Sequence, residues 1–325
     1  MGDIIISVIG RFWIYLLSNI ASIIFSIFVI FNFLFNRKLR RSLHNHVVIV
    51  ILIINFVSEI TDIPWILYYY RNGVVWIFTP LFCQTWKYLD SSTYVMIARL
   101  VAWASIERYI LIFHDDWMST KKKKILLHYI PISGIVIYGI ILYMIISFIL
   151  SCNRPYYYTI EFCGFYSCAY DSTVYSMFEF ITGGITNAII IAMFSMIIII
   201  RLIKQKHRLN QQVNWRKHRK MVIQLLSILL LFYIFYLPGV IVGILLNCGV
   251  PYSYMENVIS YGIFFSYYIN FLLPFVCAGT LPNLQKKIKN ILQFCLRHTR
   301  VTVEPTRNTV QRGETDQNGN SNRNY

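Results

Sequence analysis

The sequence has few charged side chains for its length. Asp, Glu, Lys and Arg make up 14% of the 325 residues, whereas an average soluble domain carries about 25%. Hydrophobic side chains make up 57% of the chain, so it cannot surround one water-soluble core without leaving apolar surface exposed. This composition argues against a soluble enzyme, and it excludes intrinsic disorder for most of the chain.

The sequence also lacks the short motifs that mark common catalytic and binding chemistries. No Cys or His spacing resembles a metal site, and neither a glycine-rich phosphate loop nor a nucleophile motif is present. We therefore expect no metal, no cofactor and no enzymatic activity. Internal repeats are absent as well, and this argues against a transporter built by duplication.

Seven stretches are long and apolar enough to cross a bilayer, which takes about 20 mainly apolar residues in a helix. In chain order, these spans one to seven are Phe12–Phe35, Val47–Tyr70, Leu81–Tyr109, Ile125–Leu150, Val174–Ile203, Met221–Leu246 and Val258–Leu281. They predict an all-α membrane protein folded as a bundle of seven transmembrane helices.

The basic residues of the connections predict the orientation of this bundle. The net charge is +16, and runs of Lys and Arg follow spans one, three, five and seven, whereas the other connections are nearly free of them. Cytoplasmic loops carry the excess of Lys and Arg. We therefore expect a multi-pass protein of the plasma membrane with its N-terminus outside and its C-terminus in the cytoplasm. The positive charge is then a topology signal, and nucleic-acid binding is not expected.

The C-terminal part differs from the spans. Residues 284–298 predict a short amphipathic helix that lies in the cytoplasmic interface of the membrane. Cys295 in this helix is a candidate for lipidation. Residues 299–325 are rich in Thr, Asn, Arg and Gln, and we expect them to be disordered. The membrane domain then covers residues 1–298.

Five of the seven cysteines fall at or beyond the outer membrane face, where conditions favour disulfides. Cys83 begins span three, and we expect it to bond to the long connection after span four. Cys163 and Cys168 are both suitable partners in that connection, and the spacing does not choose between them.

Span three ends in Glu107, Arg108 and Tyr109, and Arg108 follows Cys83 by 25 residues. An acid beside an arginine at a membrane boundary is weak evidence alone, because it also serves as an anchor. Within seven spans of this polarity, the separation resembles the rhodopsin-like (class A) G-protein-coupled receptors. That family has a disulfide cysteine and an (Asp/Glu)-Arg-Tyr motif at opposite ends of helix three. The chain looks most like divergent invertebrate orphan receptors.

The resemblance implies a function and the residues that carry it out. It implies that an extracellular ligand signal reaches a heterotrimeric G protein through Arg108 and its two neighbours, and that arrestin-type proteins bind the tail. Outward movement of span six about Pro238 would expose Arg108, with Tyr236 where the family usually has Trp. In span seven Pro274 is a second hinge proline, but the Asn and Tyr of the family motif are absent. Glu107 is the expected resting partner of Arg108.

Asp90 precedes Arg108 by 18 residues, which makes five helical turns, so both lie on one face about 27 Å apart. In the resembled family this position holds the carboxylate that binds ammonium groups of amines, often with a tyrosine at the position of Tyr267. We therefore expect a ligand site formed by Asp90, Trp86, Tyr94, Tyr236 and Tyr267. The alternative is that Asp90 is structural and pairs with Tyr267 or Lys87. An amine and a peptide both remain possible ligands.

Two other functions compete with a signalling receptor. An ion-coupled transporter or channel would use acids and Arg99 inside the spans as an ion path, and Glu59, Asp62 and Glu179 are candidate partners for Arg99. A non-signalling decoy receptor would explain the altered motif of span seven.

Overall fold

The computed structural model describes residues 6–150, 155–164, 169, 172–208, 223 and 226–278. Within these residues all regular structure is helical, which confirms the predicted fold class. The expected amphipathic helix 284–298, the tail 299–325, Cys168 and Cys295 lie outside the described residues. Contacts divide the chain into Met1–Leu281 and Pro282–Tyr325, and only the first of these units is described below.

The first three spans use four helices, and a short fifth helix lies between spans one and two. Span one is α1 (Val8–Phe35), and a short α2 (Arg37–Arg40) follows it. Span two consists of α3 (Leu43–Ile60) and α4 (Asp62–Asn72), which Thr61 separates. Span three is one continuous helix, α5 (Pro80–Phe113), which extends past the predicted end at Tyr109.

The remaining spans combine α-helices with π-helical turns. Span four consists of α6 (Lys121–Lys124), η2 (Ile125–Tyr129), α7 (Ile130–Met144) and η3 (Ile145–Ile149). Span five consists of α8 (Thr173–Glu179), η6 (Phe180–Ile185) and α9 (Thr186–Arg208). Span six runs over Leu226–Leu246 and includes most of α11 (Leu237–Asn247). Span seven consists of α12 (Tyr252–Ser266) and α13 (Tyr268–Ala278).

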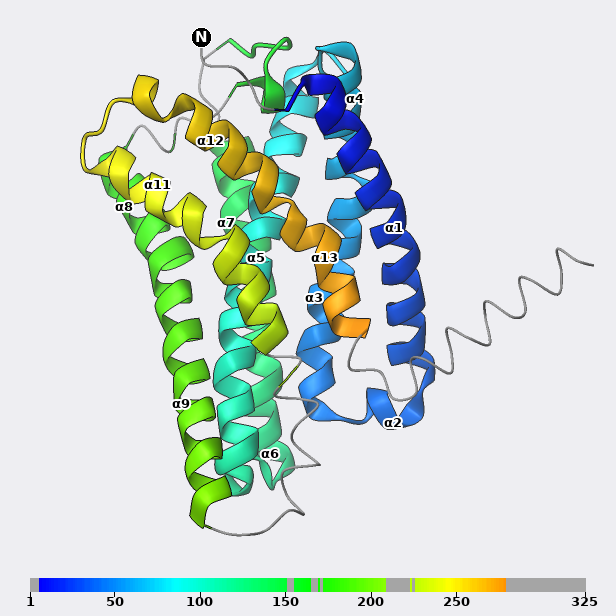
Figure 1. The fold of residues 1–325 in the computed structure, drawn as a ribbon, viewed down its shortest axis with the longest axis vertical. Helices are drawn as coiled ribbons and strands as arrows, with labels where there is room; N and C mark the ends of the chain where they lie inside the picture. The colour runs from blue at the N-terminus through cyan, green and yellow to red at the C-terminus, as the bar shows by residue number, and fades with distance from the viewer. Residues whose placement is uncertain are drawn as a thin grey trace, which may run out of the picture. The chain divides into compact units, whose positions relative to one another are not determined.

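Span three is the central helix of the bundle. It packs against α3, α4, α7 and α9 and lies behind the helices of spans six and seven in Figure 1. Its 34 residues give a length of about 51 Å, more than the hydrocarbon core of a bilayer requires. Six of the seven spans in the described residues are apolar enough to cross a membrane by composition alone. Span three is not among these six, because its hydropathy is lowered by five charged residues: Lys87, Asp90, Arg99, Glu107 and Arg108.

Local signals explain where span three begins and where span two ends. Thr79 caps α5, since its Oγ1 accepts a hydrogen bond from the backbone N–H of Phe82 at 3.3 Å. Pro80 follows at the first helical position, where its missing N–H costs nothing. Gly73 ends α4 in a left-handed conformation with φ 71°, which glycine adopts without a Cβ penalty.

Helix interruptions occur in spans two, six and seven. Tyr236 interrupts span six two residues before Pro238, as the proline's missing N–H and its ring clash lead us to expect. In span seven α13 continues through Pro274, and the interruption lies at Tyr267 instead. Pro274 nevertheless frees the carbonyl of Asn270, which accepts a hydrogen bond from Asn55 Nδ2 at 3.0 Å. The hinge predicted at Pro274 is thus a point of contact with span two.

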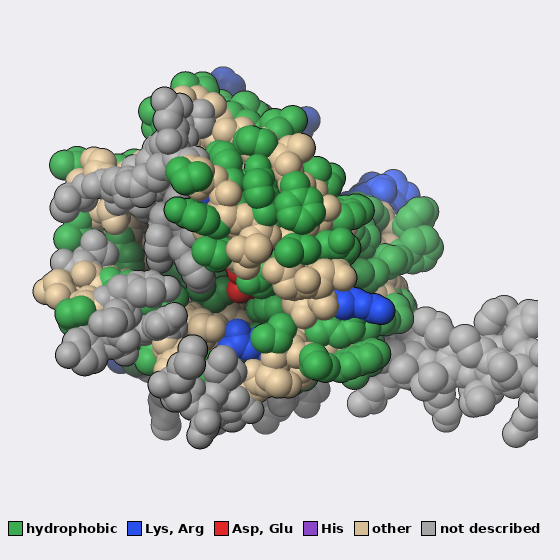
Figure 2. Space-filling view, turned by 90° about the horizontal axis from the view of Figure 1, so that it is seen from above, with side chains coloured by type: hydrophobic (Ala, Val, Ile, Leu, Met, Phe, Trp, Pro, Cys, Tyr) green, Lys and Arg blue, Asp and Glu red, His purple; other side chains and the backbone are tan. Residues whose placement is uncertain are grey.

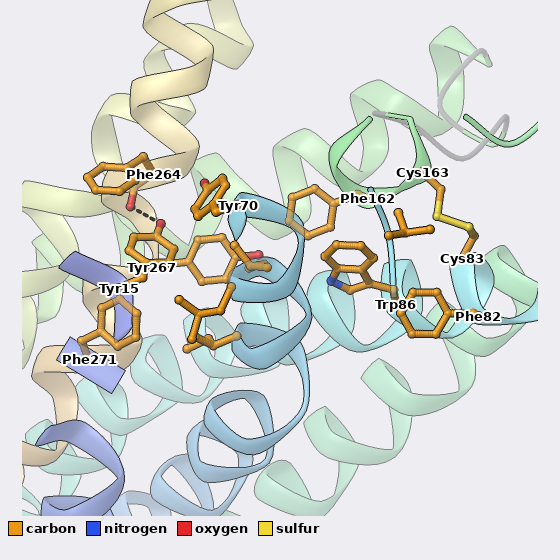
Figure 3. Packing of buried hydrophobic residues seen from close by; sticks show 14 residues of the cluster. Tyr15, Tyr70, Phe82, Cys83, Trp86, Phe162, Cys163, Phe264, Tyr267 and Phe271 are labelled. Carbon is orange, nitrogen blue, oxygen red and sulfur yellow. Dashed lines mark hydrogen bonds between the residues drawn. A yellow bond between two sulfur atoms is a disulfide. The ribbon is translucent and has the colours of Figure 1, made fainter. Parts of the chain in front are cut away.

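Aromatic side chains fill the half of the bundle that holds Cys83 and Cys163, which is the half predicted to face outward (Figure 3). Tyr15 of α1 is fully buried and donates its hydroxyl hydrogen to the carbonyl of Phe264 at 2.6 Å. Its ring stacks on Phe264 with centroids 4.8 Å apart and meets Phe271 edge-on. This packing holds span one against span seven and places Tyr267 beside it.

Candidate functional site

Asp90 and Tyr267 meet in the half of the bundle that is predicted to face outward. Asp90 lies three turns into α5, and Tyr267 lies at the junction of α12 and α13. The Tyr267 hydroxyl donates to Asp90 Oδ1 at 2.5 Å, with Tyr267 buried and Asp90 half-buried. The structure thus brings together the two residues at the centre of the predicted ligand site.

A second carboxylate, missed by sequence reasoning, belongs to the same site. Trp86 is fully buried and donates from Nε1 to Asp62 Oδ1 at 2.7 Å. Asp62 Oδ2 has no hydrogen-bond donor among the described residues, and its charge interacts with that of Asp90. Figure 2 shows acidic side-chain atoms in a recess of this end of the bundle. Asp62 was detectable as an acid inside an apolar span, but sequence alone does not place it beside Trp86.

Tyr94 and Tyr236 lie deeper in the bundle and connect three spans. Their rings stack with centroids 5.4 Å apart, which joins span three to span six at the helix interruption. The Tyr236 hydroxyl donates to the carbonyl of Gly183 in span five at 2.6 Å. Movement of span six at Tyr236 would therefore break contacts with both neighbours.

The connection after span four packs over the end of the bundle nearest the site. Cys83 and Cys163 form a disulfide, which confirms one of the two predicted pairings. Phe162 packs on Trp86 with ring centroids 5.0 Å apart (Figure 3), and the N–H of Val75 donates to the Tyr158 carbonyl at 2.9 Å. Burial raises the pKa of Glu161 in this connection to about 7.

The predicted coupling motif lies near the C-terminal end of span three, the end predicted to face the cytoplasm. Glu107 and Arg108 are 1% and 2% exposed, so neither faces solvent. Arg108 interacts electrostatically with Glu107 and with Cys277 of span seven. Glu107 Oε1 is 2.6 Å from His128 Nδ1, a partner that the sequence did not suggest. Tyr109 is half-buried under the guanidinium of Arg201, which lies 5.0 Å from the ring centroid.

Arg99 finds its partner in span five. Its Nη2 lies 3.7 Å from Glu179 Oε2, so Glu179 is selected from the three acids that the sequence offered. The hydroxyl of Tyr143 donates to the other Glu179 oxygen, and the Arg99 guanidinium lies 4.8 Å from the centroid of the Tyr138 ring. The arrangement links spans three, four and five.

Glu59 lies in a separate polar cluster between spans one and two. Its Oε1 accepts hydrogen bonds from Ser22, Ser26 and Asn55 at 2.5, 3.1 and 2.7 Å. The spacing of Asn19, Ser22 and Ser26 is the signal for this buried face. Among the described residues, no group of three or more His, Cys, Asp and Glu side chains is placed to hold a metal ion.

The architecture and the site define a class of protein, a seven-helix membrane bundle with a disulfide-tied outer lid and a charged motif at the inner end of its central helix. Residues 26–278 match the family model described as 7 transmembrane receptor (rhodopsin family). The match covers well over half of the chain, and the protein belongs to this family of G-protein-coupled receptors, which are multi-pass membrane proteins and not enzymes. No curated protein matches the chain.

Proposed function

We propose that this receptor binds a small cationic ligand at Asp90 and passes the signal to a heterotrimeric G protein. The observation that supports this most strongly is the pair of acids at the outer end of the bundle. Asp90 is half-buried beside Tyr267, and Asp62 leaves one carboxylate oxygen without a donor among the described residues. Buried acids without a matching cation favour a cationic ligand.

The remaining site residues have complementary roles in this proposal. Trp86 and Tyr94 supply aromatic surface beside the acid, and an aromatic face attracts an organic cation. Tyr236 couples the site to span six through its stacking on Tyr94. A peptide that presents a Lys or Arg side chain would satisfy the same acids, so it is the alternative ligand.

Signal transfer uses the hinge in span six. A ligand that prefers the open form shifts the equilibrium between two arrangements of the bundle. Span six then moves outward about Pro238, and a cytoplasmic crevice opens beneath Arg108. A helix C-terminus of the G protein presents free carbonyl oxygens that suit this arginine. Family membership favours this function over a transporter or channel, and nucleotide exchange separates it from a non-signalling decoy.

The test is an agonist screen with the full chain in cells, read by second messengers and started with amines. The matched variant is Asp90→Asn at equal surface expression. We expect at least one amine to activate the native chain, and the variant to need about tenfold or more of it. Responses to the same amine that do not change in Asp90→Asn would contradict the ligand assignment.

A further inference from the structure

Two carboxylates share one hydroxyl donor in the half of the bundle that is predicted to face outward. Tyr267 donates its hydroxyl hydrogen to Asp90 Oδ1 at 2.5 Å, and it also interacts with the carboxylate of Asp62. A phenol has only one hydrogen to donate, so Tyr267 cannot satisfy both acids at once. One of the two carboxylates therefore needs another donor.

The carboxylate that needs a donor belongs to Asp62. Its side chain is 1% exposed, and its Oδ1 accepts a hydrogen bond from Trp86 Nε1 at 2.7 Å. Its Oδ2 has no hydrogen-bond donor within the part of the chain that the structure describes. Burial of a carboxylate oxygen without a donor costs stability. The free oxygen of Asp62 therefore points to a ligand that supplies the missing donor.

The surrounding charges indicate how many positive charges this ligand carries. Glu161, in the connection after span four, is a third acid whose charge interacts with those of Asp90 and Asp62. Arg11 interacts with Glu161 and so offsets the charge of that acid. Among the described residues, no Lys, Arg or His forms a salt bridge with Asp62 or Asp90. Two negative charges thus remain without a matching cation.

Lys87, which the sequence offers as a partner for Asp90, does not supply one of these cations. It precedes Asp90 by three residues on α5, but its ammonium group lies 5.4 Å from the centroid of the Tyr156 ring. The acids do not converge on a metal ion either, since no group of three or more His, Cys, Asp and Glu side chains is suitably placed in the described ranges. An organic ligand with more than one positive charge fits these observations better.

We propose that the ligand is a short linear diamine, with one ammonium group bound by Asp90 and the other by the free oxygen of Asp62. This inference rests on the proposed function and specifies its ligand. Asp62 contacts Trp86, and Trp86 precedes Asp90 by four residues, so the two ammonium positions lie about one helical turn or about 6 Å apart. A chain of about four methylene groups spans that separation at ordinary bond lengths.

Trp86 lies between the two ammonium positions and suits the methylene chain that joins them. It is fully buried, and Phe162 packs on it with ring centroids 5.0 Å apart. Methylene groups are stabilised against such an aromatic surface. A monoamine at Asp90 would leave Asp62 without its donor, and a site with an unpaired buried polar group discriminates against the ligand that leaves it so.

Binding to the purified full chain in lipid nanodiscs tests the charge of the ligand without any G protein. The probes are putrescine and cadaverine, which are diamines, and n-butylamine, which has the carbon chain of putrescine but one ammonium group. Affinity is obtained from the rise of the thermal unfolding midpoint with ligand concentration. We expect at least one diamine to bind about tenfold or more tightly than butylamine. Equal affinities of the diamines and butylamine would overturn the proposal.

Asp62→Asn tests which residue binds the second ammonium group. The variant loses the negative charge but keeps an oxygen that accepts from Trp86, so we expect the diamine affinity to fall to that of butylamine and the butylamine affinity to stay native. Glu59→Gln is the matched control, because Glu59 is a buried acid of the same span in a separate polar cluster, and it should keep the preference for the diamine. A native preference in Asp62→Asn would refute the role of Asp62.

The same measurements separate this inference from the proposed function. Butylamine binding that is lost in Asp90→Asn, without a preference for either diamine, would support the cationic ligand site and overturn only the diamine. A chain that binds none of the three amines would count against the proposed ligand site and against this inference together.

Discussion

Tyr267 donates its phenolic hydrogen to Asp90 at 2.5 Å and joins the seventh span to the third. The contact fixes the direction of the Asp90 carboxylate, since a hydrogen bond to an ionised group is strong and directional. It also lies at the junction between α12 and α13. The ligand that we propose at Asp90 would therefore act on spans three and seven together.

Tyr267→Phe tests this orienting role. The substitution keeps the aromatic ring and removes the donor, so we expect the most active amine to lose about tenfold in potency. Tyr68→Phe is the matched control, because Tyr68 is 37% exposed at the outer end of span two. Equal potency of the native chain and Tyr267→Phe in a second-messenger dose response would contradict the role given to Tyr267.

Cys83→Ser tests the outer lid. The disulfide closes a loop with a sequence separation of 80 residues, so its loss should reduce stability by about 2–5 kcal/mol. Cys248→Ser changes a free, exposed thiol and should leave stability unchanged. The measurement is the thermal unfolding midpoint of the purified receptors under non-reducing conditions. Equal midpoints for the two variants would contradict a stabilising role of the disulfide.

Glu161→Gln tests the buried acid of the lid through pH. Burial raises the pKa of Glu161 to about 7, so between its ordinary pKa of about 4.3 and about 7 the folded state binds more protons than the unfolded state. Stability is then greatest at acid pH and falls as pH rises to about 7, by about 1–3 kcal/mol. Comparison of unfolding midpoints at several pH values should show this fall in the native chain only, and the same fall in the variant would exclude Glu161 as its source.

The pair of Arg99 and Glu179 predicts a non-additive stability effect. Arg99→Met leaves the carboxylate of Glu179 buried without its cation, and this should destabilise the receptor by about 3–5 kcal/mol. The double variant Arg99→Met with Glu179→Met removes both charges and should recover most of that loss. Thermal unfolding of the two single variants and the double variant measures the coupling, and simple additivity would show that the 3.7 Å contact is not a stabilising pair.

Much of the fold was predictable, because a membrane-spanning helix can be identified from its own residues alone. Each of the seven spans was recognisable from its run of apolar residues, and the charge of the connections gave a predicted orientation. The boundaries were less accurate. The predicted span three stops directly after the charged pair Glu107 and Arg108, whereas α5 continues through the apolar residues 110–112 to Phe113. The interruption at Tyr267 was not predicted, since the proline that signals a break lies seven residues later.

The site was predictable only in part, because polar contacts between spans depend on helix rotation and depth. The spacing of Asp90 from Arg108 and the position of Tyr267 were sufficient to suggest a meeting of Asp90 with Tyr267. The partners of Trp86, Glu107 and Arg99 were not predictable, since several buried polar groups compete for each donor. The choice of Cys163 over Cys168 as the partner of Cys83 likewise depended on the path of the connection after span four, which the sequence does not give.

The most direct test of the coupling role is GDP release from purified heterotrimeric G proteins by the full chain in nanodiscs, with and without the amine panel. We expect the native receptor to accelerate release and Arg108→Ala to abolish that acceleration while it still folds and reaches the membrane. Arg71→Ala, at the exposed outer end of span two, should behave as the native chain. Equal acceleration by the native receptor and by Arg108→Ala at the same receptor density would contradict coupling through Arg108.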